Sequence, residues 1–129
     1  MTLFGRYTTH ADLPDSEYHL IELPGHSAFE LSTLLRGIPQ EGAPVSIEIG
    51  AGCLQFQLSS VPGLRACLTQ PKSILITADP RSIATLADEL QAMSDTPVEP
   101  DYLPHVHLDA YLTEPLEGLS DIVIQRYDD

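Results

Sequence analysis

The spacing between apolar residues changes along this chain, and that change constrains the fold more than any other feature. Residues 45–59 alternate apolar and polar side chains around a glycine-containing turn, which predicts a β-hairpin with one solvent-facing side. Residues 80–94 instead place apolar side chains every three or four positions, which predicts an α-helix. Asp79 is a favourable N-cap and Pro80 a favourable first helical residue. The chain therefore combines strands with helices.

A second helix is predicted for residues 27–37. Ser27 and Glu30 have the spacing of a capping box, in which each side chain satisfies an amide of the first turn. Gly37 and Pro39 are expected to end this helix.

The remaining strands are predicted from short apolar or alternating runs at residues 18–23, 64–69, 73–78, 105–109 and 121–127, after a lead-in over residues 1–16 that is irregular or a short strand. The uninterrupted apolar run in residues 73–78 favours a central strand covered on both faces. The last two strands are expected to pair. The order β-α-β-β-β-α-β-β predicts a single α+β domain over residues 1–129, with a mostly antiparallel sheet of about six strands and two helices on one face.

Composition excludes several classes of protein. The chain has 129 residues, of which 43% are hydrophobic, enough for a packed core. No apolar run is long enough to span a membrane, and the N-terminus has no export signal, so we expect a cytoplasmic protein. The net charge of −13 argues against binding nucleic acid or an anionic membrane. Cys53 and Cys67 are expected to be buried free thiols, with a disulfide between neighbouring strands as the alternative.

The negative charge is concentrated near the C-terminus. Residues 94–129 contain nine acidic residues and a single base, Arg126, and so carry −8 of the net charge of −13. Such a segment can simply keep the protein soluble. It can also meet a basic protein partner, because opposed potentials accelerate association.

One group of residues could bind a metal ion. His105, His107 and Asp109 alternate along a predicted strand and would share one face, as ligands of Zn²⁺ or non-haem iron do, and Asp101 or Glu114 could complete the shell. The same alternation is also typical of a strand with a structural or interface role. The sequence contains no nucleophile motif, phosphate-binding loop or dinucleotide-binding motif, so we expect neither an enzyme nor a cofactor.

Four pieces follow one another in the segment from Ile74 to Tyr127: the strand of residues 74–79, the helical run Leu86-Ala87-Asp88-Glu89-Leu90, the motif His105-Val106-His107-Leu108-Asp109, and the strand of residues 121–124. In this order they resemble a small family of bacterial immunity proteins from polymorphic toxin systems. The resemblance implies a protein that binds and blocks a cognate toxin without catalysis.

Together, charge and resemblance predict an immunity protein that covers a basic toxin surface in the cytoplasm. Tyr102 and Tyr111 are expected to be the energetic anchors, because aromatic residues contribute most to interfaces. The full predicted contact set is Asp95, Glu99, Asp101, Tyr102, His105, His107, Asp109, Tyr111, Glu114 and Glu117. The alternatives are a small metal-binding protein or metalloenzyme that uses His105, His107 and Asp109, and an assembly domain that pairs with itself through a sheet edge.

Overall fold

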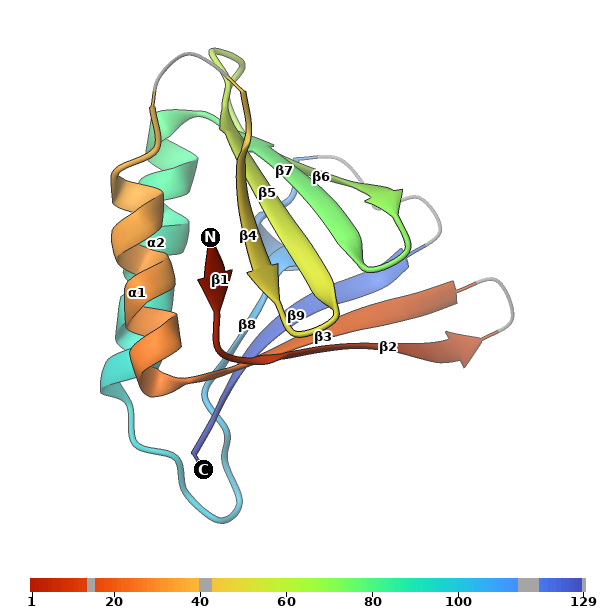
Figure 1. Ribbon diagram of the computed structural model, residues 1–129, viewed down its shortest axis with the longest axis vertical. Coiled ribbons are helices and arrows are strands. Elements are labelled where there is room, and N and C mark those ends of the chain that lie inside the picture. The colour runs from red at the N-terminus through yellow and green to blue at the C-terminus, as the bar shows by residue number, and fades with distance from the viewer. Residues whose placement is uncertain (14–15, 40–42, 114–118, 129) are drawn as a thin grey trace.

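The computed structural model describes residues 1–13, 16–39, 43–113 and 119–128 (Figure 1). The N-terminal part comprises β1 (Thr2–Leu3), β2 (Arg6–Leu13), β3 (Ser16–Pro24), α1 (Gly25–Arg36), β4 (Val45–Ile49) and β5 (Gly52–Leu58). It is followed by β6 (Leu64–Gln70), β7 (Ser73–Ala78), α2 (Pro80–Asp95), β8 (His105–His107), the short 3-10 helix η1 (Leu108–Tyr111) and β9 (Leu119–Tyr127).

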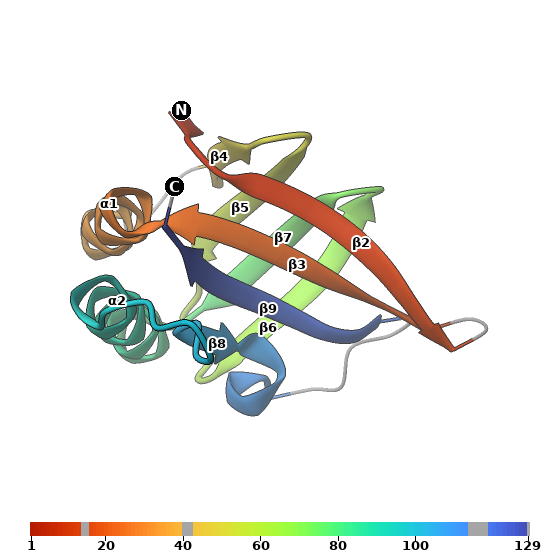
Figure 2. The same cartoon turned by 90° about the horizontal axis from the view of Figure 1, so that it is seen from below.

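The strands form two sheets that face each other. Sheet A has five strands in the order β1-β4-β5-β7-β6, and sheet B has four in the order β2-β3-β9-β8. The two helices lie side by side along one side of this pair of sheets (Figures 1 and 2). Within the described residues, no helix has the length and apolar character needed to cross a membrane.

The α+β class is confirmed, but the single, mostly antiparallel sheet is not what forms. β1 pairs with β4, β5 with β7 and β3 with β9 in parallel, while the other four pairs are antiparallel. The chain crosses from sheet A to sheet B directly between β1 and β2. Apolar periodicity reports which face of a strand is buried, but it does not report which strand lies beside it.

The core lies between the inner faces of the sheets and the helices. Its fully buried members include Ile21, Leu31, Leu54, Phe56, Ile74, Ile76, Leu90, Ile122 and Ile124. The sheets meet closely where Tyr7 of β2 packs on Gly52 of β5: a Cβ added to Gly52 would lie 2.2 Å from the Tyr7 ring. The Tyr7 hydroxyl also makes a buried hydrogen bond of 2.5 Å with Nδ1 of His19.

The two helices begin differently. α2 begins as predicted, with the Asp79 carboxylate accepting hydrogen bonds from the backbone amides of Ser82 and Gly63. The predicted capping box of α1 is wrong, because β3 runs through Pro24 and the helix begins at once, at Gly25. Ser27 is therefore already inside the helix, and its Oγ is buried without a hydrogen-bond partner.

Three local predictions are also corrected. β7 alternates between buried and half-buried residues, so Leu75 lies on the outer face of sheet A and the strand is not covered on both sides. Cys53 and Cys67 are free thiols, as expected, but they are half-buried and exposed, because their strand positions point outward. The strand predicted over residues 105–109 ends at His107, where the chain turns into η1. The predicted pairing of β8 with β9 is confirmed.

Candidate functional site

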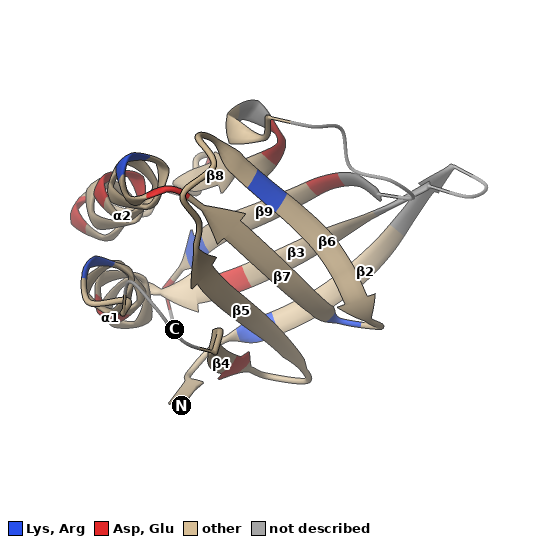
Figure 3. Cartoon of the chain, turned by 90° about the horizontal axis from the view of Figure 1, so that it is seen from above, with Lys and Arg blue, Asp and Glu red and all other residues tan. Residues whose placement is uncertain are grey.

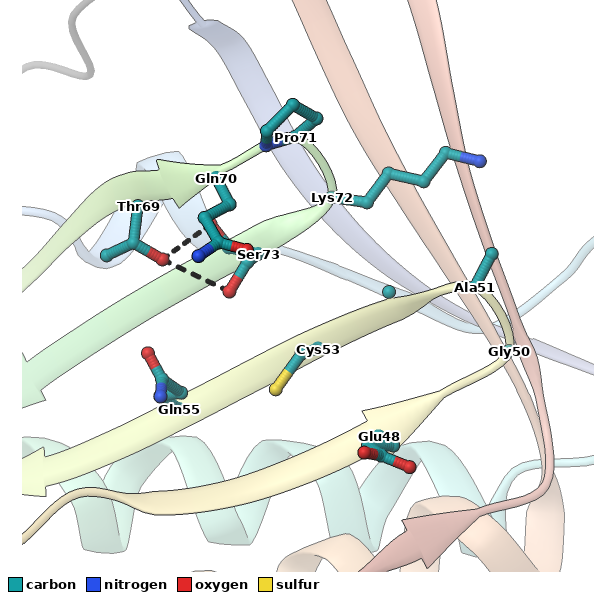
Figure 4. Close-up of a pocket in the computed structure, with 11 residues that line it drawn as sticks. Glu48, Gly50, Ala51, Cys53, Gln55, Thr69, Gln70, Pro71, Lys72 and Ser73 are labelled. Atoms are coloured by element: carbon teal, nitrogen blue, oxygen red, sulfur yellow. Dashed lines mark hydrogen bonds between the residues drawn. The ribbon is translucent and has the colours of Figure 1, made fainter.

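The outer face of sheet A has a hollow at the end that carries the β4–β5 and β6–β7 turns (Figure 4). It encloses about 570 Å³ and is lined mainly by small or uncharged residues. Thr69 Oγ1 lies 3.3 Å from the carbonyl oxygen and 3.1 Å from the Oγ of Ser73, and it hydrogen-bonds to both. Figure 3 shows few charged residues on the strands of sheet A. The lining offers hydrogen-bonding groups together with one acid, Glu48, and one base, Lys72.

A denser group of polar side chains lies on sheet B, where β8 pairs with β9. Asp121 of β9 lies on the same face as His107 of β8, because His107 is in register with Val123, two residues further along β9. Nδ1 of His107 lies 2.5 Å from Oδ2 of Asp121, and the other Asp121 oxygen accepts a 2.7 Å hydrogen bond from the amide of Ile122. Which of the two groups donates in this contact depends on the tautomer of His107. Asp121 is thus held in place from both sides.

The turn into η1 brings Asp109 to the same place. His107, Asp109 and Asp121 each offer a ligand atom, and these atoms all lie within 4.8 Å of one another. His105 was expected in this group but lies beside it: its ring packs edge-on against that of His107 at 4.9 Å, and its Nδ1 is 2.8 Å from the carbonyl oxygen of Leu103. Asp121 could not be chosen from spacing, because only strand pairing brings it to His107.

The loop before β8 adds exposed apolar surface. Tyr102 and Leu103 are 50% and 36% exposed, and the Tyr102 ring lies 6.1 Å from that of His105. Paired backbone hydrogen bonds between Glu99 and Tyr102 fix the turn in this loop. We call the exposed side chains of Tyr102, Leu103, His105 and His107 the β8 surface. The exposed acidic residues Glu99, Asp101 and Asp109 lie in the segments on either side of β8, and Asp95 ends α2.

Tyr111 is placed differently from Tyr102. It is half-buried and packs against the hydrophobic core. Burial raises the pKa of its hydroxyl, and the nearby Glu89 carboxylate raises it further through its charge and a hydrogen bond. Glu114 and Glu117 lie outside the described residues.

Arg126 of β9 joins the C-terminal end of α2 to the segment just before β8, a role that the sequence analysis did not assign. Its Nη1 donates to carbonyl oxygens at the C-terminal end of α2, at 2.7 Å for Ser94 and 2.5 Å for Thr96. Its backbone amide donates to the carbonyl oxygen of Pro104 at 2.8 Å, just before β8. α2 has no basic residue in its last turn, and this was the available signal that another segment supplies one.

The comparison with protein families found a match in the C-terminal part of the chain. Residues 73–127 match the family Immunity protein 32. This match supports the predicted resemblance to an immunity protein family, and it runs from β7 to the end of β9. The matched range includes the whole β8 surface, since Tyr102 to His107 lie inside it. No curated protein and no solved structure matches the chain.

Proposed function

We propose that this protein is an immunity protein that binds and neutralises a cognate bacterial toxin through the β8 surface and the acidic residues around it. The observation that carries the proposal is the family match, because the matched residues 73–127 contain every residue of this surface. An immunity protein acts by covering its toxin, so the proposed function needs no catalytic group and no cofactor.

The physical character of the surface suits a protein partner. Tyr102 and Leu103 offer exposed apolar area, and aromatic residues at the centre of an interface contribute most of its binding energy. The acidic residues on either side of β8 would exclude like-charged partners and accelerate the approach of a basic one. We therefore propose a basic toxin surface as the partner, met in the cytoplasm. Tyr111 would act indirectly, because its packing on the core anchors η1, the helix that also carries Asp109.

The experiment that tests this proposal compares two exposed aromatic residues. The toxin is first identified from a neighbouring reading frame or by a pull-down, and rescue of cells that express it is then scored. Tyr102→Ala should weaken toxin binding about 30-fold, the effect of losing a residue that contributes about 2 kcal/mol. Phe29→Ala on α1 is the matched control, because Phe29 is 52% exposed but lies outside the matched segment. Equal affinity of the two variants would refute the β8 surface as the binding site.

A further inference from the structure

We propose that His107, Asp109 and Asp121 form a binding site for a divalent transition metal ion of the zinc class. The site goes beyond the toxin-binding function, because it would bind its ion in the isolated protein. Its three residues come from β8, η1 and β9, so the ion would tie together three elements at the edge of sheet B.

The distances are close to those of a coordination sphere. Zinc binds imidazole nitrogen and carboxylate oxygen at roughly 2.0–2.2 Å, so ligand atoms of a tetrahedral site lie about 3.4 Å apart. Nδ1 of His107 and Oδ2 of Asp121 are 2.5 Å apart, and no ligand atom of the group is more than 4.8 Å from another. Moving the His107–Asp121 pair apart by about 1 Å, and the other pairs together by at most about 1.4 Å, gives that geometry. The tautomer of His107 that carries its proton on Nε2 leaves Nδ1 a lone pair for the ion. The His107 side chain is 49% exposed, so rotation about its own bonds can supply part of this movement.

The donor set selects the class of metal. One imidazole nitrogen with two carboxylates suits zinc and its first-row neighbours, whereas calcium and magnesium prefer oxygen ligands alone. The amide of Ile122 holds Oδ1 of Asp121 at 2.7 Å and turns Oδ2 toward His107, which is the orienting role of an outer-shell hydrogen bond at metal sites. Water would complete the coordination, because the group lies at the protein surface.

The electrostatic setting favours the same conclusion. Asp109 and Asp121 lie together in a chain of net charge −13. A bound divalent cation would neutralise both carboxylates, so its binding should stabilise the folded state.

The test uses the purified full chain after treatment with a chelator and needs no toxin. Zn²⁺ titration should show one site by calorimetry and raise the melting temperature, and Co²⁺ should give the visible absorption of a bound ion. His107→Ala and Asp109→Asn should each weaken binding by roughly 10- to 100-fold or more, the range seen when even outer-shell partners are lost. Asp109→Asn keeps the size and shape of the side chain, so it remains informative if His107→Ala perturbs folding.

Two control variants exclude other ligands. His10→Ala removes an exposed histidine elsewhere on sheet B, and Cys67→Ser removes the exposed thiol of sheet A. Both should bind zinc like the unmodified protein. Absence of binding, binding that survives His107→Ala and Asp109→Asn, or equal affinity for Ca²⁺ would overturn the proposal. Because toxin is absent from the assay, these outcomes leave the toxin-binding proposal to its own test.

Discussion

Arg126 offers a quantitative test of how this fold holds its C-terminal half together. Its side chain is only 15% exposed and donates from Nη1 to the last carbonyl groups of α2. Arg126→Met keeps most of the apolar stem and removes the charge and the donors. A hydrogen bond from a charged group contributes about 1.5–3 kcal/mol net, and a cation at a helix C-terminus adds about 0.3–1 kcal/mol. Since these effects overlap, we expect a loss of about 3 kcal/mol in the free energy of unfolding.

The measurement is urea unfolding followed by circular dichroism, together with a thermal melt. A loss of that size should lower the melting temperature by roughly 10 °C in a domain of this length. Arg81→Met is the matched control: it removes the same charge from an exposed position in the first turn of α2. A cation at the N-terminal end of a helix is not stabilised by the helix dipole, so this control should change stability much less. Equal losses for the two variants would show that Arg126 does not stabilise the fold by capping α2.

Three further predictions concern other parts of the molecule. Gly52→Ala should lower the free energy of unfolding by about 1–3 kcal/mol, because the added methyl group meets the Tyr7 ring between the sheets; an unchanged urea midpoint would contradict that close packing. The hydrogen bond from Ser82 lowers the pKa of Asp79 below its ordinary value of 3.8, so the ionised carboxylate stabilises the fold above that pH. The stability advantage over Asp79→Asn should therefore be complete at pH 7 and shrink as the pH falls through the lowered pKa, and a pH-independent difference would refute this assignment. Glu99→Lys combined with Asp101→Lys should slow toxin association and reduce its dependence on salt, measured by stopped flow, whereas Glu30→Lys with Glu48→Lys makes the same change in net charge away from the β8 surface and should slow association less.

Helix-start residues, helical spacing and strand alternation were enough to predict α2 and the β4–β5 hairpin. α2 follows from Asp79, Pro80 and an apolar stripe at helical spacing, and the hairpin of β4 and β5 follows from alternation around a turn. Each of these signals involves residues a few positions apart, whose backbone geometry is fixed by their own neighbours. The capping box failed for α1 because the pairing of β3 with β9, a contact between distant segments, carries extended structure through Pro24.

The sequence by itself determined the α+β class, the position of the main helix and the resemblance to immunity proteins over the C-terminal part of the chain. Only the tertiary structure decided that the strands divide between two sheets, that Asp121 joins His107 and Asp109, and that Arg126 caps α2. Apolar periodicity specifies which side of a strand or helix is buried, because burial depends on the face that each residue occupies. It does not specify which distant segment covers that side, since many pairings bury similar apolar area and the choice between them depends on the packing of the whole chain.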